Sequence, residues 1–190
     1  HRCIMNYMKP SKELIIYLAG IMDADGYFTI KRDTYGIRKV GDSKNPSYYE
    51  RIGIKQTQPD VINIIHKYFG GYRNIQKPNA KKGKLLHGVQ LTNKQAHVFA
   101  KELYPYLRLK KAQVGILLDL RKSLDEGKAQ KQVSYHKSRW GKIVKFTRYG
   151  LSQRQIKVRE ILLTKIKSLN DSRHDPYHQP KLSQLSLISP

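Results

Sequence analysis

The chain has 190 residues, of which 39% are hydrophobic, and it carries 37 Lys and Arg against 14 Asp and Glu, for a formal net charge of +23 at pH 7. No apolar run approaches the roughly 18 residues of a transmembrane helix, which excludes a membrane span, and the single Cys3 excludes an intramolecular disulfide. So large a positive charge is self-repulsive unless a polyanion is the usual partner, and nucleic acid is therefore the leading partner class.

The first elements are a helix and two strands. Apolar residues at helical spacing predict a helix over 12–24, with Ser11 as its N-cap and Gly26 at its end. From Tyr27 the period changes to two, which predicts a half-buried strand. The alternation resumes from Tyr48 to Gln56, and this second strand is expected to pair with the first as a hairpin.

The same order of elements follows once more. Pro59 and Asp60 open a predicted helix that Gly70 and Gly71 end. Further elements are expected in this order: strands at Tyr72–Gln76 and Leu86–Thr92, a helix capped by Asn93 and reaching about Leu103, a helix over Leu107–Leu124, and a last helix through Leu169 that opens on a capping box of Ser152 and Gln155.

This order predicts an α+β protein with one domain. Residues 11–125 form its αββαββα core, preceded by an N-terminal extension over 1–10. Residues 126–170 are expected to be a basic loop and a C-terminal helix of the same domain, with 171–190 as a loosely ordered tail.

Two carboxylates stand in the last turn and cap of the first helix. Asp23 and Asp25 lie where the helix dipole is negative, so an acid there is destabilised by up to about 1 kcal/mol. We expect something positive at this place: a divalent cation such as Mg²⁺, a Lys or Arg side chain, or both. Ala19 and Gly20 precede them and are small enough to let a second helix approach closely, which would bring two acidic helix ends together.

The run Leu18-Ala19-Gly20-Ile21-Met22-Asp23-Ala24-Asp25-Gly26 resembles the motif of the LAGLIDADG homing endonucleases at seven of nine positions. The element order, Gln56, the Phe69-Gly70-Gly71 helix end and the segment 105–113 also resemble that family. The resemblance implies a four-stranded antiparallel, saddle-shaped sheet that lies in the DNA major groove. Because only one copy of the motif is present, it also implies a homodimer, with a contact formed by Leu14, Leu18, Ala19, Gly20, Met22 and Asp23.

The resemblance further implies roles for individual residues. Asp25 corresponds to the essential metal ligand, and the carbonyl of Ala24 faces the same Mg²⁺ site, in which Mn²⁺ can substitute; Asp23 is more structural. Gln56 corresponds to a residue that orients the solvent around the attacking water. Lys110 corresponds to a lysine beside the scissile phosphate.

The outward residues of the predicted strands are rich in side chains that pair with base edges, although the solvent side of any antiparallel sheet alternates in the same way. The predicted DNA-binding residues are Thr29, Lys31, Asp33, Tyr35, Tyr49, Arg51, Lys55, Tyr72, Asn74, Gln76 and Gln90, with Arg108, Lys111, Lys137, Arg139 and Lys142 on phosphates. Relatives often have a basic residue shortly after the glutamine; here Thr57-Gln58-Pro59-Asp60 follows Gln56, and either Lys55 or Arg51 is a candidate substitute.

The function that these residues predict is site-specific, metal-assisted cleavage of both strands of a long pseudo-palindromic DNA target, leaving short 3′ overhangs, by an enzyme encoded in an intron. The alternatives are an RNA-binding maturase of the host intron and a non-cleaving DNA-binding protein. The start of the sequence shows no targeting signal, so we expect a bacterial or archaeal cytoplasm, or an organelle interior.

Overall fold

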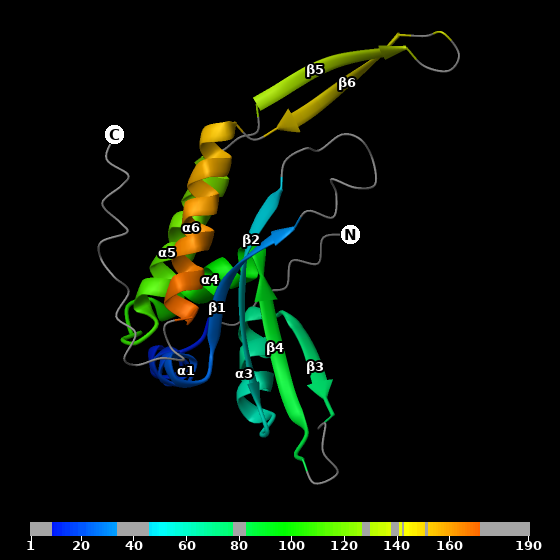
Figure 1. The fold of residues 1–190 in the computed structure, drawn as a ribbon. Helices are drawn as coiled ribbons and strands as arrows, with labels where there is room; N and C mark the ends of the chain where they lie inside the picture. Colours follow the sequence, from blue (N-terminus) through cyan, green and yellow to red (C-terminus); the bar gives the residue numbers. More distant parts are fainter. Residues whose placement is uncertain are drawn as a thin grey trace.

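The computed structural model describes residues 9–33, 46–77, 83–126, 130–137, 141, 143–150 and 152–171. Figure 1 shows a curved sheet with helices packed beside it and a two-stranded hairpin that extends beyond them. The elements are α1 (Lys12–Ala24), β1 (Tyr27–Asp33), β2 (Ser47–Gln56), α3 (Asp60–Phe69), β3 (Tyr72–Gln76), β4 (Leu86–Thr92), α4 (Asn93–Leu103), α5 (Lys111–Glu126), β5 (Gln130–Lys137), β6 (Ile143–Gly150) and α6 (Gln153–Asp171).

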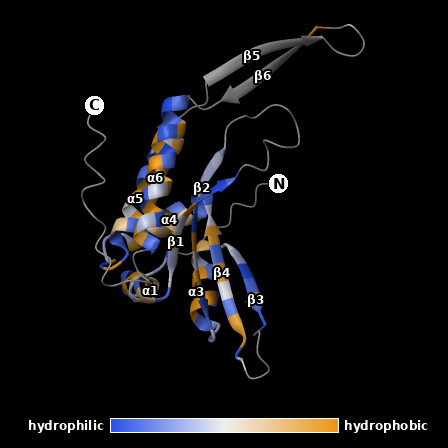
Figure 2. Ribbon diagram, viewed as in Figure 1, coloured by the Kyte–Doolittle hydropathy of each residue, from blue (hydrophilic) through white to orange (hydrophobic). Residues whose placement is uncertain are grey.

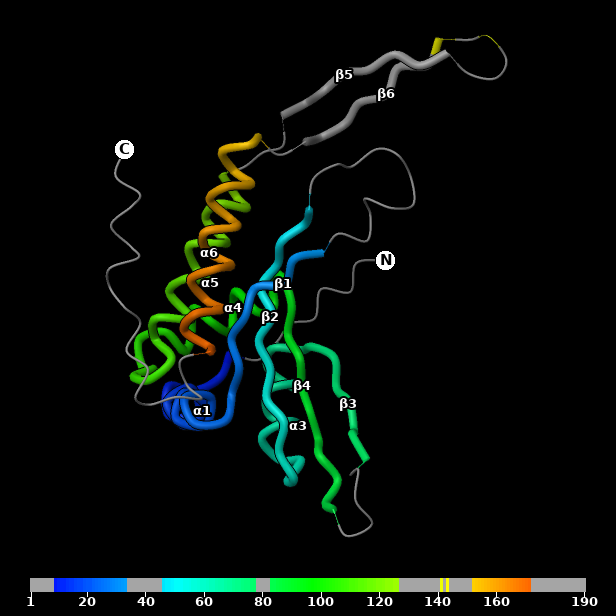
Figure 3. The backbone as a smooth tube through the Cα atoms, viewed as in Figure 1, coloured from blue at the N-terminus to red at the C-terminus, as the bar shows by residue number. Residues whose placement is uncertain are grey.

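The α+β class and the αββαββα order are confirmed. β1 to β4 form one antiparallel sheet in the order β1-β2-β4-β3. Figure 3 shows these strands curving alongside one another. In none of the described helices is there a stretch long and apolar enough to cross a membrane.

One face of the sheet is buried beneath the helices. Phe28, Ile52 and Leu91 lie directly opposite one another on β1, β2 and β4, and all three are fully buried. The helices contribute their apolar stripes to the same core, as α1 does with Ile15 and Leu18. Because side chains alternate along a strand, the other residues of each strand point to the opposite face, which we call the outer face.

The first helix begins and ends as predicted. Ser11 is its N-cap, and the Ser11 hydroxyl accepts a hydrogen bond from the Leu14 N–H at 3.2 Å. At the other end, a Cβ on Gly26 would lie 2.7 Å from the Met22 carbonyl oxygen, so only glycine allows the chain to turn into β1 here.

Two predicted helix starts were wrong. The N-cap of α4 is Thr92, not Asn93. Asn93 is the first residue of the helix and has a φ of 52°, which an asparagine tolerates. α5 begins at Lys111 rather than Leu107, because the backbone N–H groups just before it bind a side chain from α1 instead of continuing a helix. Apolar spacing alone does not reveal such a long-range bond.

The segment expected to be a basic loop contains a hairpin instead. β5 and β6 pair along their whole length, from Gln130 opposite Gly150 to Lys137 opposite Ile143. α6 then opens on the predicted capping box, in which Ser152 and Gln155 bind each other's backbone N–H groups. α6 packs against α5 and β1.

Polar bonds fasten the C-terminal helices to the sheet. Glu50 on β2 is fully buried and binds Arg121 of α5 through both carboxylate oxygens, at 2.7 and 2.5 Å. The Tyr48 hydroxyl donates to Glu160 of α6, and burial raises the pKa of this phenol. Arg159 of α6, only 3% exposed, donates to the carbonyl of Ser123 at 2.8 Å. α5 and α6 are therefore integral to the domain.

We predict that Glu50→Ala lowers the free energy of unfolding by about 3–5 kcal/mol, because it removes the buried partner of the Arg121 guanidinium and leaves only the exposed Asp125, 3.9 Å away. Urea denaturation followed by circular dichroism measures this change. Lys122→Ala is the matched control: its bond to Asp119 is exposed, so the loss should stay below about 1 kcal/mol. Equal losses for the two variants would contradict a special role of the buried pair.

Candidate active site and nucleic-acid interface

The C-terminal end of α1 lies beside the end of β2. Gln56, the last residue of β2, donates a hydrogen bond from Nε2 to Oδ2 of Asp25 at 3.1 Å. Both residues line one solvent-open cavity of about 540 Å³, together with Lys55, Thr57, Gln58 and Leu86. The fold thus brings together two predicted site residues that are 31 positions apart.

Asp23 turns away from this cavity and holds the turn that precedes α5. Its carboxylate accepts the backbone N–H of Arg108 at 2.7 Å, of Leu109 at 3.3 Å and of Lys110 at 2.9 Å. An anion at these N–H groups also complements the positive end of the α5 dipole. The expectation of a structural role fits this geometry, whereas a dimer contact does not, because both carboxylate oxygens bind within the chain.

Lys110 is the positive group that the end of α1 requires. Its side chain is buried, with 4% of the residue exposed, and Nζ donates to the carbonyl oxygens of Met22 at 3.1 Å, Ala24 at 2.9 Å and Gly26 at 2.6 Å. Carbonyls at a helix C-terminus lack intrahelical partners and attract the nearest cation. In this structure the ammonium of Lys110 is therefore bound within the chain, and its predicted role beside a scissile phosphate stays a prediction.

The oxygen atoms at the end of α1 suit a hard cation. Asp25 keeps the carboxylate oxygen that Gln56 does not bind, and the Ala24 carbonyl keeps one lone pair beside its bond to Lys110. Carboxylate and carbonyl oxygens are the ligands that Mg²⁺ prefers. The described part of the chain contains no group of three or more His, Cys, Asp or Glu that could hold a metal ion, so Asp25 is the carboxylate that this cavity offers.

The predicted dimer contact is corrected in part. Leu18, Ala19 and Met22 are fully buried in their own chain, because the stripe at positions 15, 18, 19 and 22 of α1 packs into the core. The opposite side of α1 is exposed, and we call it the exposed stripe; its members are Glu13, Ile16, Tyr17, Gly20 and Ala24. Ile16 is 48% and Tyr17 53% exposed, and no atom lies within 4 Å of the place where a Gly20 Cβ would stand. Leu14 is half-buried.

The register places ten predicted DNA-binding residues on the outer face. Three opposed rows of this face run from Tyr27 through Gly53 and Gln90 to Tyr72, from Thr29 through Arg51 to Thr92, and from Lys55 through Gly88 to Asn74. The ten residues are Thr29, Lys31, Asp33, Tyr49, Arg51, Lys55, Tyr72, Asn74, Gln76 and Gln90, and each is exposed or half-buried. β3, at one edge, is hydrophilic along most of its length (Figure 2).

Gly53 and Gly88, on the outer face, make room for neighbouring side chains, and a Cβ on Gly88 would collide with the side chain of Asn74. A Cβ on Gly53 would lie 2.7 Å from the Val89 carbonyl oxygen, and it would collide with Tyr27, whose hydroxyl reaches Gln90 at 3.4 Å. Tyr27 was not among the predicted DNA-binding residues, although the alternation that places Thr29 on the outer face places Tyr27 there as well. The Arg51 guanidinium lies 5.8 Å from the centre of the Tyr27 ring, and its Nε has no hydrogen-bond partner in the described structure.

The remaining predicted contacts are only partly placed. Arg108 and Lys111 are exposed at the start of α5, and Lys111 lies over the ring of Tyr104 at 5.3 Å. Tyr35, Arg139 and Lys142 lie outside the described residues, and for Lys137 only the backbone within β5 is described. The role of these residues stays a prediction.

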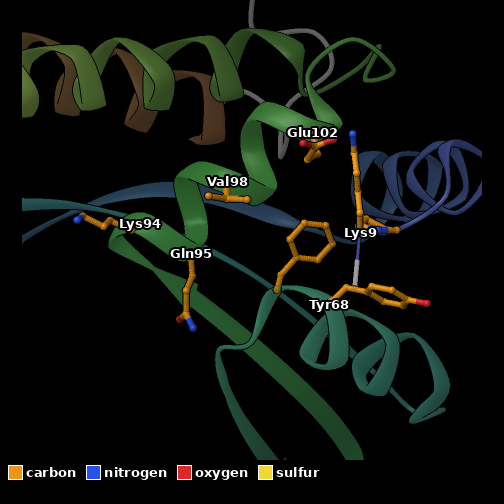
Figure 4. Close-up of a pocket in the computed structure, with 8 residues that line it drawn as sticks. Lys9, Tyr68, Lys94, Gln95, Val98 and Glu102 are labelled. Atoms are coloured by element: carbon orange, nitrogen blue, oxygen red, sulfur yellow. The ribbon is translucent and has the colours of Figure 1, made fainter. Parts of the chain in front are cut away.

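A second cavity, of about 390 Å³, lies between α3 and α4 (Figure 4). Tyr68, Phe69 and Val98 give it an apolar wall, and Lys9 and Lys94 stand at its margin. None of the predicted site residues lines it, so it is separate from the cavity of Asp25.

Solved structures of other proteins have a fold similar to that of this chain. The homing endonuclease I-CvuI in complex with its target aligns at a TM-score of 0.54 and 19% sequence identity, covering 84% of this chain and 83% of that one. The archaeal intron-encoded homing endonuclease I-Vdi141I complexed with DNA aligns at a TM-score of 0.50 and 14% identity, covering 92% and 94%. No protein-family model matches the chain, and neither does any curated protein. The fold is that of the LAGLIDADG homing endonucleases.

We predict that Asp23→Ala destabilises the protein by about 2 kcal/mol, since it removes the acceptor for three N–H groups before α5. Hydrogen exchange at the amides of Arg108, Leu109 and Lys110 should accelerate more than exchange in the sheet. Unchanged protection at these three amides would contradict the bonds described here.

Proposed function

We propose that this protein is a homodimeric, Mg²⁺-dependent endonuclease that cuts both strands of a long, pseudo-palindromic DNA site and leaves short 3′ overhangs. The observation that carries the proposal is the Asp25–Gln56 pair at the edge of a polar, cationic sheet face. A face chosen only for binding phosphates would gain nothing from a carboxylate next to it. The names of the two similar structures, one a homing endonuclease in complex with its target and the other an intron-encoded homing endonuclease complexed with DNA, support the same assignment.

The outer face supports DNA as the partner. A curved antiparallel sheet can enter the major groove, where base edges present a distinct pattern for each pair. Arg51, Lys55 and Lys31 offer cationic donors, and Asn74, Gln76 and Gln90 offer amides that can pair with adenine.

The exposed stripe of α1 supports the homodimer. Ile16 and Tyr17 present apolar surface, and Gly20 lets a second backbone come close. Two copies related by a two-fold axis along this stripe would bring their Asp25 residues to the same place, between the two outer faces. Such symmetry makes the target pseudo-palindromic, with one strand cut by each subunit.

The chain's own residues would divide the chemistry between them. Asp25 and the Ala24 carbonyl would hold Mg²⁺, which when bound lowers the pKa of water and stabilises the attacking and leaving oxygens. Gln56, with its carbonyl oxygen left over from the bond to Asp25, would orient the water for in-line attack. Lys110 would keep the end of α1, and therefore Asp25, in position. An intron is the proposed source of the gene, as the name of I-Vdi141I suggests for that relative.

We predict that Asp25→Asn abolishes cleavage but retains DNA binding, because the change removes one charge while keeping the shape and the bond to Gln56. The measurement incubates wild type and variant with a library of random duplexes in Mg²⁺ or EDTA, and sequences the cut ends. Near-palindromic sites cut by wild type only, and only with metal, are the expected result.

Two outcomes would contradict this assignment. Cleavage by Asp25→Asn would remove Asp25 from the chemistry. Failure of wild type to cut any duplex, together with tight binding of structured RNA, would favour the maturase instead.

We predict that Gly20→Leu converts the dimer to a monomer without unfolding it. In the isolated chain the new side chain meets open space, and leucine favours a helix by about 1 kcal/mol relative to glycine. Light scattering at several protein concentrations measures the change. Lys165→Leu, an equally exposed helical position on α6, is the control and should leave the mass unchanged. A dimeric Gly20→Leu would rule out the exposed stripe as the contact.

A further inference from the structure

The proposed cleavage builds negative charge at the scissile phosphate. The water oxygen forms a bond to phosphorus while the bond from phosphorus to the leaving sugar oxygen breaks; the water releases a proton to solvent and the leaving oxygen takes one up. A cation that touches the phosphate in the transition state commonly contributes a factor of about 10²–10³ to the rate. In this structure Nζ of Lys110 is bound to three carbonyl oxygens, and Lys110 does not line the cavity of Asp25.

Lys55 is the basic side chain that lines the cavity of Asp25 and Gln56. It directly precedes Gln56 on β2 and points to the outer face, where DNA would lie. The residue is exposed, and Nζ makes one hydrogen bond, to Oε1 of Gln76 at 2.9 Å. An ammonium has three donors, so two are left for a ligand at this place.

The other basic side chains near the end of β2 are directed elsewhere. Arg51 stacks on Tyr27 and lines a different cavity, together with Lys31 and Lys167. Lys111 lies over the ring of Tyr104 and does not line the cavity of Asp25. The sequence left Lys55 and Arg51 as candidates for the basic residue that relatives have after the glutamine. The geometry selects Lys55.

We propose that Lys55 is a catalytic residue that contacts the scissile phosphate, and that Gln76 is the positioning residue that holds its ammonium at the cavity before DNA binds. This inference rests on the proposed endonuclease function and adds the cation that the reaction requires. The Lys55 stem also packs near Gly88, which lies directly opposite on β4 and has no side chain to displace it.

The test compares Lys55→Met with wild type on a duplex that wild type cuts. Methionine keeps much of the stem and removes the charge, and the site is exposed, so the fold should persist. We expect the single-turnover rate at saturating protein to fall about 100-fold or more. Binding, measured in an Asp25→Asn background, should weaken less than about tenfold, with its salt dependence reduced by about one phosphate contact. Lys55→Arg should restore most of the rate.

Lys101→Met, which removes an exposed lysine of α4 outside the outer face, is the control and should cut like wild type. If Lys55→Met cuts within about threefold of wild type while Asp25→Asn is inactive, the inference on Lys55 is overturned and the endonuclease function stands. If Lys55→Met loses binding and rate in parallel, Lys55 is a DNA contact only. If wild type cuts nothing, the function and the inference fall together.

Discussion

The end of α1 is fixed by two side chains of opposite charge, which connect it to the turn before α5. Asp23 binds three backbone N–H groups of that turn, and Lys110 returns from the same turn to bind three carbonyls around the end of α1. The carbonyl groups at the end of α1 and the N–H groups at the start of α5 have no partners within their own helices. A charged side chain from the other segment therefore binds each set. Asp25 lies between the bound carbonyls of Ala24 and Gly26, and its backbone therefore has little freedom. The position of the candidate active site depends on these two sets of hydrogen bonds.

The helix α1 serves two packing surfaces at once. Its buried stripe, which includes Leu18 and Met22, belongs to the core, while Ile16, Tyr17 and Gly20 are left uncovered on the other side. A helix that carries apolar residues on both sides normally lies between two partners. One of these is the core of its own chain, where α1 packs against α4, and the proposed second copy would be the other. β2 also has two different faces. Ile52 and Ile54 face the core, and the residues between and beside them face outward.

The sequence was sufficient for those features that depend on local pattern, and insufficient for those that depend on long-range bonds. Alternation and helical spacing predicted the four sheet strands and their hairpins, and hence the side to which residues such as Arg51 and Gln90 point. The start of α5 was wrong because Asp23, more than 80 positions away, takes up the N–H groups there. For the same reason the sequence predicted a cation at the end of α1 but not that Lys110 supplies it. β5 and β6 were missed because dense positive charge obscured a weak alternation around Val133 and Phe146, although Gly141, with a φ of 76°, lies between them in the sequence.

Gly53, on the outer face, has a consequence for any attempt to retarget this protein. Tyr27 lies across Gly53 to reach Gln90 and supports Arg51, so these side chains form one connected unit rather than independent contacts. Exchanging a single member would disturb the geometry of the others. Altered recognition should therefore arise from selecting linked residues together, and libraries that randomise positions one at a time should recover few improved variants.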